Sequence, residues 1–128
     1  MSLKVAVATD QGEKFVNRHF GDAEFYYIYD VDKNKADFKL KIANNSVEER
    51  KHADPNKAKS IVKILKEKDV QVGVNLKFGP NIKRVKKHFV PVLIDTSDIE
   101  KGLKKLSDNY DELKKLWDQG EKRSHFKF

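Results

Sequence analysis

The run Leu3-Lys4-Val5-Ala6-Val7-Ala8-Thr9 decides the fold of this chain. A short, nearly continuous apolar run of this kind is typical of a β-strand that is buried on both faces. The residues Asp10-Gln11-Gly12 end the run with polar and turn-forming side chains. Because strands buried on both faces belong to sheets that helices cover on two sides, the run predicts an α/β protein.

Two more strands follow the first and form a hairpin. Residues 24–31 are rich in aromatic side chains, which strands favour. Residues 32–35 read Asp-Lys-Asn-Lys and have turn chemistry. Residues 37–43 alternate apolar and lysine side chains, as in an antiparallel strand with one face in solvent. We therefore expect an antiparallel hairpin whose second strand lies at one edge of the sheet.

Three helices alternate with two further strands in the rest of the chain. We expect the helices to begin where capping or helix-starting residues precede apolar residues at helical spacing, namely at Asp54-Pro55, Gly79-Pro80 and Ser97-Asp98-Ile99-Glu100. The last of these helices is expected to run unbroken to Leu116 or Trp117. The two strands are expected over residues 70–74 and 90–94, which are rich in valine.

These elements fit one topology. A right-handed crossover after the hairpin returns the chain to pair the fourth strand beside the first. We expect a three-layer α/β fold with a five-stranded mixed sheet of order 3-2-1-4-5, an antiparallel second strand and helices on both faces. Pro91 cannot donate a ladder hydrogen bond, which favours the other edge for the fifth strand. Residues 1–117 are expected to form a single domain, and residues 118–128 a loosely docked C-terminal tail.

The composition excludes several classes of site. The chain has no cysteine, so disulfides and thiolate metal sites are excluded. Its formal net charge of +7 admits a nucleic-acid interface, but we favour a solvated lysine-rich surface, with the basic cluster at residues 83–88 on the solvent face of a helix. No segment resembles a signal peptide or reaches the ~20 apolar residues of a membrane-spanning helix. We expect a cytoplasmic protein without a membrane partner.

The loops after the first, third and fourth strands should meet at one end of the sheet, where open α/β sheets bind ligands. His19 and His52 are the candidate metal ligands at this end, because a neutral imidazole nitrogen binds metals. A histidine that only braces its loop is the alternative for His19. The other candidate ligand-binding residues are Asp10, Asn17, Arg18, Phe20, Gly21, Phe78, Gly79, Pro80 and Asn81. Arg18 can pair with an anion, and the helix start at Gly79 can cradle one.

The segment His19-Phe20-Gly21-Asp22-Ala23, placed between a buried strand ending in Thr9-Asp10 and an aromatic strand, resembles the dinitrogenase iron–molybdenum cofactor biosynthesis family. That family includes the NifX-like carriers and the C-terminal domain of NifB-like proteins. A second region of resemblance comprises residues 78–81 and 89–92, and the whole extends over roughly residues 3 to 106.

The resemblance implies a ribonuclease H-like fold and binding of an iron–sulfur or iron–molybdenum cluster, or its precursor, during cofactor assembly. It makes His19 the first candidate ligand, with Arg18 and Gly79 facing anionic groups, and it implies cofactor-assembly proteins as partners. Many relatives carry a histidine- and glycine-rich loop before the first helix. Here residues 49–54 keep His52 but lack the glycines.

Other functions fit the sequence as alternatives. A ribonuclease H-like protein with a basic surface can bind RNA, and exposed Tyr26, Tyr27 or Tyr29 could stack bases. A two-metal nuclease needs several carboxylates around one site, and the sequence offers Asp10 with Asp95 at a distance. A non-catalytic interaction subunit is the third reading. We expect no enzyme, because nucleophile elbows and glycine-rich phosphate loops are both missing from the sequence.

Overall fold

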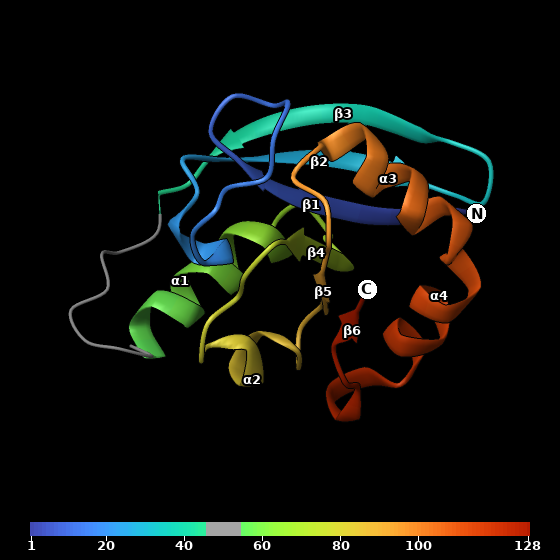
Figure 1. Cartoon of the computed structure of the whole chain (residues 1–128). Helices are drawn as coiled ribbons and strands as arrows, with labels where there is room; N and C mark the ends of the chain where they lie inside the picture. The colour runs from blue at the N-terminus through green and yellow to red at the C-terminus, as the bar shows by residue number, and fades with distance from the viewer. Residues whose placement is uncertain (46–54) are drawn as a thin grey trace.

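The computed structural model describes residues 1–45 and 55–128 (Figure 1). Six strands form one mixed sheet in the order β3-β2-β1-β4-β5-β6. The strands are β1 Leu3–Thr9, β2 Phe25–Val31, β3 Ala36–Ala43, β4 Val72–Asn75, β5 Val90–Leu93 and β6 Phe126–Lys127. The expected order 3-2-1-4-5 is confirmed, but the strand count of five is wrong because β6 adds a sixth strand beyond β5.

β1 lies at the centre of the sheet. It pairs antiparallel with β2 along its whole length, from Leu3 opposite Val31 to Thr9 opposite Phe25. On its other side it pairs parallel with β4, with Ala6 opposite Gly73. The antiparallel second strand and the hairpin of β2 with β3 are therefore as predicted.

Helices cover both faces of the sheet, as expected (Figure 1). The part of the chain that the structure describes has four α-helices, α1 Pro55–Lys66, α2 Ile82–Val85, α3 Ile99–Asp108 and α4 Tyr110–Asp118, and two 3-10 turns, η1 Phe20–Asp22 and η2 Gly120–Lys122. One apolar core lies between the sheet and α3–α4, and a second lies between the sheet and α1–α2. We call the two pairs of helices, each with the core beneath it, the α3–α4 layer and the α1–α2 layer.

The alternation of β1 explains how two different cores share one strand. Val5 and Val7 face the α3–α4 layer, while Ala6 and Ala8 face the α1–α2 layer. The alanines leave room on their side for a cluster of aromatic rings. Gly73 on the neighbouring strand serves the same purpose, since a Cβ there would stand 2.6 Å from the ring of Phe89.

The C-terminal segment is more closely integrated than the sequence indicates. The expectation of a loosely docked tail over residues 118–128 is wrong, because β6 pairs with β5 through Val92–Phe126 and Leu93–Lys127. Arg123 is 3% exposed. Its guanidinium donates hydrogen bonds to the carbonyl oxygens of Leu116, Trp117 and Lys86 at 3.1, 2.9 and 2.9 Å.

The edge position expected for the proline strand is wrong for the same reason. β5 has β4 on one side and β6 on the other. β6 pairs with Val92 and Leu93 of β5. Pro91 lies outside this pairing with β6, so its missing N–H costs no hydrogen bond between β5 and β6.

The long C-terminal helix is broken at Asn109, which has φ −113° and ψ 23° and separates α3 from α4. The expectation of one unbroken helix to residue 117 is therefore wrong. The predicted start is close: Asp98 caps α3, and its carboxylate accepts a hydrogen bond from the Lys101 amide at 3.0 Å. The predicted cap Asp54 of α1 lies outside the described residues. The ribonuclease H-like label stays a prediction.

Candidate functional site

The loop between β1 and β2 is fixed by Asp10. Arg18 donates from Nη2 to both carboxylate oxygens of Asp10 at 2.9 Å, and the amide of Glu24 donates to Oδ1 at 3.0 Å. Partial burial acts to raise the pKa of Asp10, but the hydrogen bonds from Glu24 and Arg18 together with the positive charge of Arg18 outweigh it, so the pKa lies below its ordinary value. Asp10 therefore stays ionised and holds the two ends of the loop together.

Asn75 connects this loop to the end of β4. The side chain is fully buried, and its amide nitrogen donates to the carbonyl oxygens of Arg18 at 2.8 Å and Lys77 at 3.1 Å. The amide of Phe20 donates to the same Lys77 oxygen at 2.8 Å. Sequence reasoning missed Asn75. Its only signal is a polar residue that ends the otherwise apolar run Val72-Gly73-Val74.

Phe20 anchors the loop in the α1–α2 layer. Its ring is 2% exposed and stacks on Phe78 with ring centroids 4.7 Å apart. Tyr26 and Phe89 flank it with centroids 5.0 and 5.7 Å away, and the Tyr26 hydroxyl donates to the Phe20 carbonyl at 2.9 Å. The rings of Phe20 and Phe78 thus serve as core that positions the loop. Their contact with a ligand stays a prediction.

His19 lies directly over Gly79. The backbones of His19 and Lys77 form a parallel β-bridge, which brings the two loops side by side. Gly79 has φ +73°, and a Cβ at this position would stand 2.6 Å from Nδ1 of His19. Only glycine leaves the space that the imidazole fills, and only glycine adopts this backbone conformation without strain. The sequence-based expectation that these two loops meet is confirmed.

The His19 ring is partly exposed. Within residues 1–45 and 55–128 no group hydrogen-bonds to either ring nitrogen, so neither nitrogen is committed to bracing the loop. A narrow crevice of about 30 Å³ lies beside it, roughly the space of one water molecule. Six predicted site residues line this crevice: His19, Phe20, Gly21, Phe78, Pro80 and Asn81.

Other predicted residues are placed differently. Arg18 is engaged with Asp10, and Asn17 is exposed outside the crevice. His52 lies outside the described residues, as do the other residues 49–54 of that loop. The helix start at Gly79 leads into an α2 of four residues, and the Ile82 amide already donates to the Gly79 carbonyl at 3.2 Å. Since peptide dipoles sum along a helix, one turn offers an anion little attraction.

The described residues contain no group of three or more histidine or acidic side chains that could hold a metal ion. The two carboxylates considered for a nuclease site are both paired, Asp10 with Arg18 and Asp95 with Lys105. Tyr26 is fully buried, which removes it as a base-stacking residue, and Tyr27 and Tyr29 pack against Phe38. None of the helices described is long and apolar enough to cross a membrane.

The loops that follow β1 and β4 meet at the carboxyl ends of these strands, and we call this place the rim. The fold and the rim define a small α/β protein that presents a partly exposed histidine at one end of a mixed sheet. Residues 1–109 match the family model described as dinitrogenase iron-molybdenum cofactor, and the chain belongs to this family.

Solved structures share the fold. A crystal structure of a candidate dinitrogenase from Methanocaldococcus jannaschii is similar with a TM-score of 0.58 and 22% identity, over 85% of this chain and 91% of that chain. An NMR structure of a candidate dinitrogenase from Methanococcus jannaschii gives a TM-score of 0.56 and 18% identity, over 86% and 91% of the two chains. No curated protein matches the chain. At these identities the likeness shows the fold alone.

Proposed function

We propose that this protein binds an iron–sulfur or iron–molybdenum cluster, or a precursor of one, as cargo during metallocofactor assembly in the cytoplasm, and that it catalyses no reaction itself. His19 is the metal ligand in this proposal, and cofactor-assembly proteins are the partners. The observation that carries it is the His19 ring, which is partly exposed and keeps both nitrogens available among the described residues. Membership of the family supports the choice of cargo.

The donor set suits a cargo better than a resident metal. A permanent site needs about four protein ligands, and the described residues offer no cluster of three. The crevice of about 30 Å³ cannot enclose a multi-atom cluster, so a cluster would rest on the open rim beside His19. A site with few protein ligands and an open face can release what it binds, which a carrier requires.

The rim is rigid where the cargo would rest. Phe20 is locked in the aromatic cluster, and Asn75 and Asp10 tie the loop at both ends. The imidazole is therefore positioned before binding, which lowers the entropic cost of forming the metal bond.

Anaerobic transfer from a cluster donor tests the proposal. The unaltered protein is expected to gain a visible chromophore and bound iron. His19→Gln, which keeps a polar side chain over Gly79, should lose most of both. The matched control is His125→Gln, because His125 is exposed near the C-terminus and far along the chain from the rim. Cluster uptake by His19→Gln equal to that of the control would exclude His19 as the ligand, and no uptake by the unaltered protein would exclude the carrier function.

A further inference from the structure

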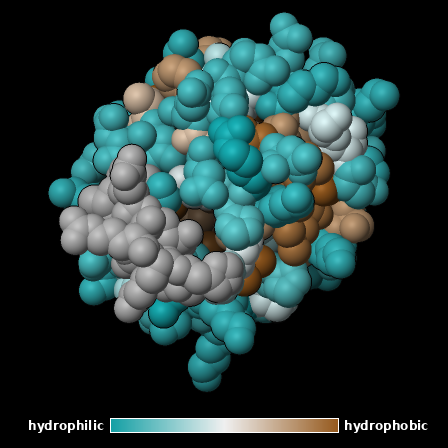
Figure 2. Space-filling model, turned by 60° about the vertical axis from the view of Figure 1, so that its left-hand side comes forward, coloured by the Kyte–Doolittle hydropathy of each residue, from teal (hydrophilic) through white to brown (hydrophobic). Residues whose placement is uncertain are grey.

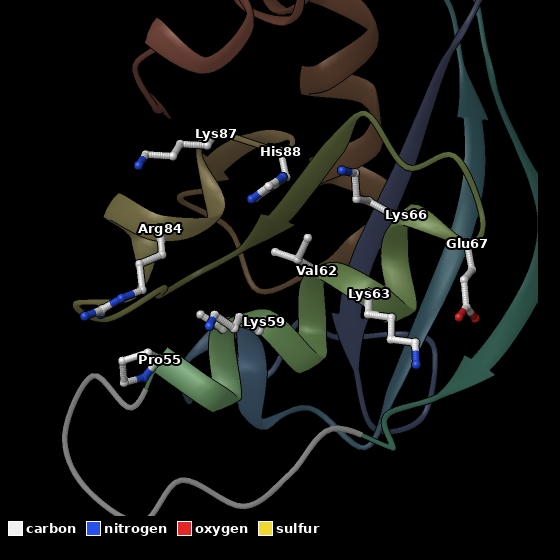
Figure 3. Close-up of a pocket in the computed structure, with 10 residues that line it drawn as sticks. Pro55, Lys59, Val62, Lys63, Lys66, Glu67, Arg84, Lys87 and His88 are labelled. Atoms are coloured by element: carbon white, nitrogen blue, oxygen red, sulfur yellow. The ribbon is translucent and has the colours of Figure 1, made fainter.

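A second and much larger hollow lies in the α1–α2 layer, on the outer surface between the two helices (Figure 3). Its volume is about 740 Å³, which falls within the roughly 300–1,000 Å³ typical of sites for small organic ligands. We call it the α1–α2 groove. It is lined by Pro55, Ala58, Lys59, Val62, Lys63, Lys66, Glu67, Arg84, Lys87 and His88.

The floor of the groove is apolar. Ala58 and Val62 supply it from α1. The methylene stems of the lysines extend the apolar surface up the walls, since lysine buries its stem and keeps its amine in water. An inorganic anion would gain nothing from such a floor, whereas an apolar group laid on it would be removed from water.

The rim of the groove is strongly cationic. Lys59, Lys63 and Lys66 project from α1, and Arg84, Lys87 and His88 stand on the segment across from them (Figure 3). Among the described residues that line the groove, Glu67 is the only acidic one. Lys59, Lys63, Lys66 and Lys87 form no ion pair with any acidic side chain in residues 1–45 and 55–128.

His88 adds a titratable group to this wall. Its partial burial, and next the positive charge of Lys66, hold the pKa of His88 below its ordinary value. The ring is therefore neutral at physiological pH and can donate or accept a hydrogen bond. Lys87 and Arg123 act in the same direction as Lys66, and Glu121 opposes them.

We propose that the α1–α2 groove binds a small amphipathic organic anion, with its apolar body on Ala58 and Val62 and its phosphate or carboxylate groups held by the lysines of the rim. The match of an apolar floor with unpaired lysines carries this proposal. The described residues that line the groove include no aromatic ring of Phe, Tyr or Trp, so they offer no stacking platform of the kind that single-stranded nucleic acid uses. His19 does not line the groove, although Ala58 lines both the groove and the crevice beside His19. The proposal does not rest on the proposed cargo function.

Dodecyl phosphate, kept below its critical micelle concentration, is the probe. Titration followed by amide NMR should shift signals of α1 and of residues 84–88, and calorimetry should give a binding constant. The double variant Lys63→Glu with Lys66→Glu should weaken binding by about tenfold or more, which corresponds to about 1.4 kcal/mol. The matched control is Lys101→Glu with Lys104→Glu, which makes the same change of net charge on α3 and should bind as the unaltered protein does.

Further ligands and variants separate the contribution of the anionic group from that of the apolar chain. Inorganic phosphate and the uncharged dodecyl maltoside should each bind far more weakly than dodecyl phosphate, because each offers only half of the required chemistry. His19→Gln should bind dodecyl phosphate unchanged, which keeps this result independent of the cluster experiment. Val62→Asp supplies a second variant, expected to lose binding through the floor while circular dichroism verifies the fold.

Three results would overturn the proposal. Equal weakening in the α1 and α3 double variants would reduce the effect to net charge. Binding to vesicles of phosphatidylglycerol without binding to monomeric dodecyl phosphate would make the groove a membrane-docking surface. Tighter binding of a single-stranded RNA, lost in the same α1 variant, would make it a nucleic-acid interface.

Discussion

The two helical layers of this protein are alike in packing and different in charge. Each buries a large apolar core against the same sheet. Residues 55–88, which include α1 and α2, hold 10 of the 27 lysines and arginines but only 2 of the 20 acidic residues, a net charge of +8. The rest of the chain carries a net charge of −1. The excess positive charge of the protein therefore comes from this segment.

The ion pairs of the lysines also differ between the two layers. On the α3–α4 layer, Lys104, Lys105 and Lys114 lie within 3.1 Å of the carboxylates of Asp108, Asp95 and Asp118. The lysines of the α1–α2 groove have no such partners among the described residues. Exposed ion pairs contribute little to stability, so their main effect is to neutralise the α3–α4 face. The lysines of the α1–α2 groove are not neutralised in this way and produce a positive potential at the groove.

Hydrophilic side chains cover most of the surface shown in Figure 2, with apolar atoms visible between them.

The largest expected effects test whether the two layers contribute equally to stability. Leu65→Ala in the α1–α2 core and Leu106→Ala in the α3–α4 core should each lower the free energy of unfolding by about 2–5 kcal/mol, because both side chains are at most 1% exposed. Urea denaturation measures both. A cost below about 1 kcal/mol for Leu65→Ala alone would mean that α1 is only loosely docked.

Two glycines with similar backbones provide the next comparison. Gly79 has φ +73° beneath the His19 ring, while Gly120 has φ +68° and no atom within 4 Å of the place where a Cβ would stand. Gly120→Ala should cost about 1–2 kcal/mol, from backbone strain alone. Gly79→Ala should cost more, because its methyl group must displace the imidazole. Equal losses in urea denaturation would contradict the close packing of His19 on residue 79.

A smaller effect is expected from reversing charge on the two layers. Lys63→Glu with Lys66→Glu removes cations that form no ion pair among the described residues, but both stand in the last turn of α1, where the helix dipole favours a cation. The change should therefore lower the free energy of unfolding by about 0.3–1 kcal/mol per residue. Lys104→Glu with Lys114→Glu breaks two ion pairs spaced four residues apart, Lys104–Asp108 and Lys114–Asp118. It should lower stability by roughly 0.3–0.5 kcal/mol per pair. Thermal melts at low salt compare the two double variants, and a loss from the α1 change well above this helix-dipole contribution would contradict the absence of ion pairs at those lysines.

The smallest effect is a pH dependence from His88. The pKa of His88 is lowered in the folded state, so the unfolded state binds more protons below its ordinary value of 6.5. Stability contributed by His88 is therefore present above pH 6.5 and declines as the pH falls toward the folded-state pKa. His88→Gln should flatten this decline in urea midpoints, whereas the exposed His125→Gln should not. Identical slopes in the two variants would contradict the desolvation of His88.

Much of the fold follows from residue patterns. The apolar run at Leu3 predicts the central strand, and the alternation after residue 36 predicts the edge hairpin. β6 could not be predicted, because a strand of two residues is too short to show a period. The break at Asn109 was missed because the apolar spacing continues through it, from Leu106 to Leu113.

The site shows the same division. The predicted strand order correctly places the loop of His19 beside the loop of Gly79, because the order of the strands alone sets which loops are neighbours. The pairing of Arg18 with Asp10 depends on the path of the loop, which residue types do not specify. The α1–α2 groove depends on the distance between two helices, and the sequence shows only that residues 83–88 are basic.

The position of Arg123 has a consequence for how the protein can be shortened or tagged. β6 covers the side of β5 that would otherwise present unpaired backbone groups, and it lies beyond the residues that the family model matches. A chain ended at residue 117 would leave the carbonyl oxygens of Lys86, Leu116 and Trp117 without their donor and open that edge to another molecule. Such a chain should self-associate, and an affinity tag is better placed at the N-terminus.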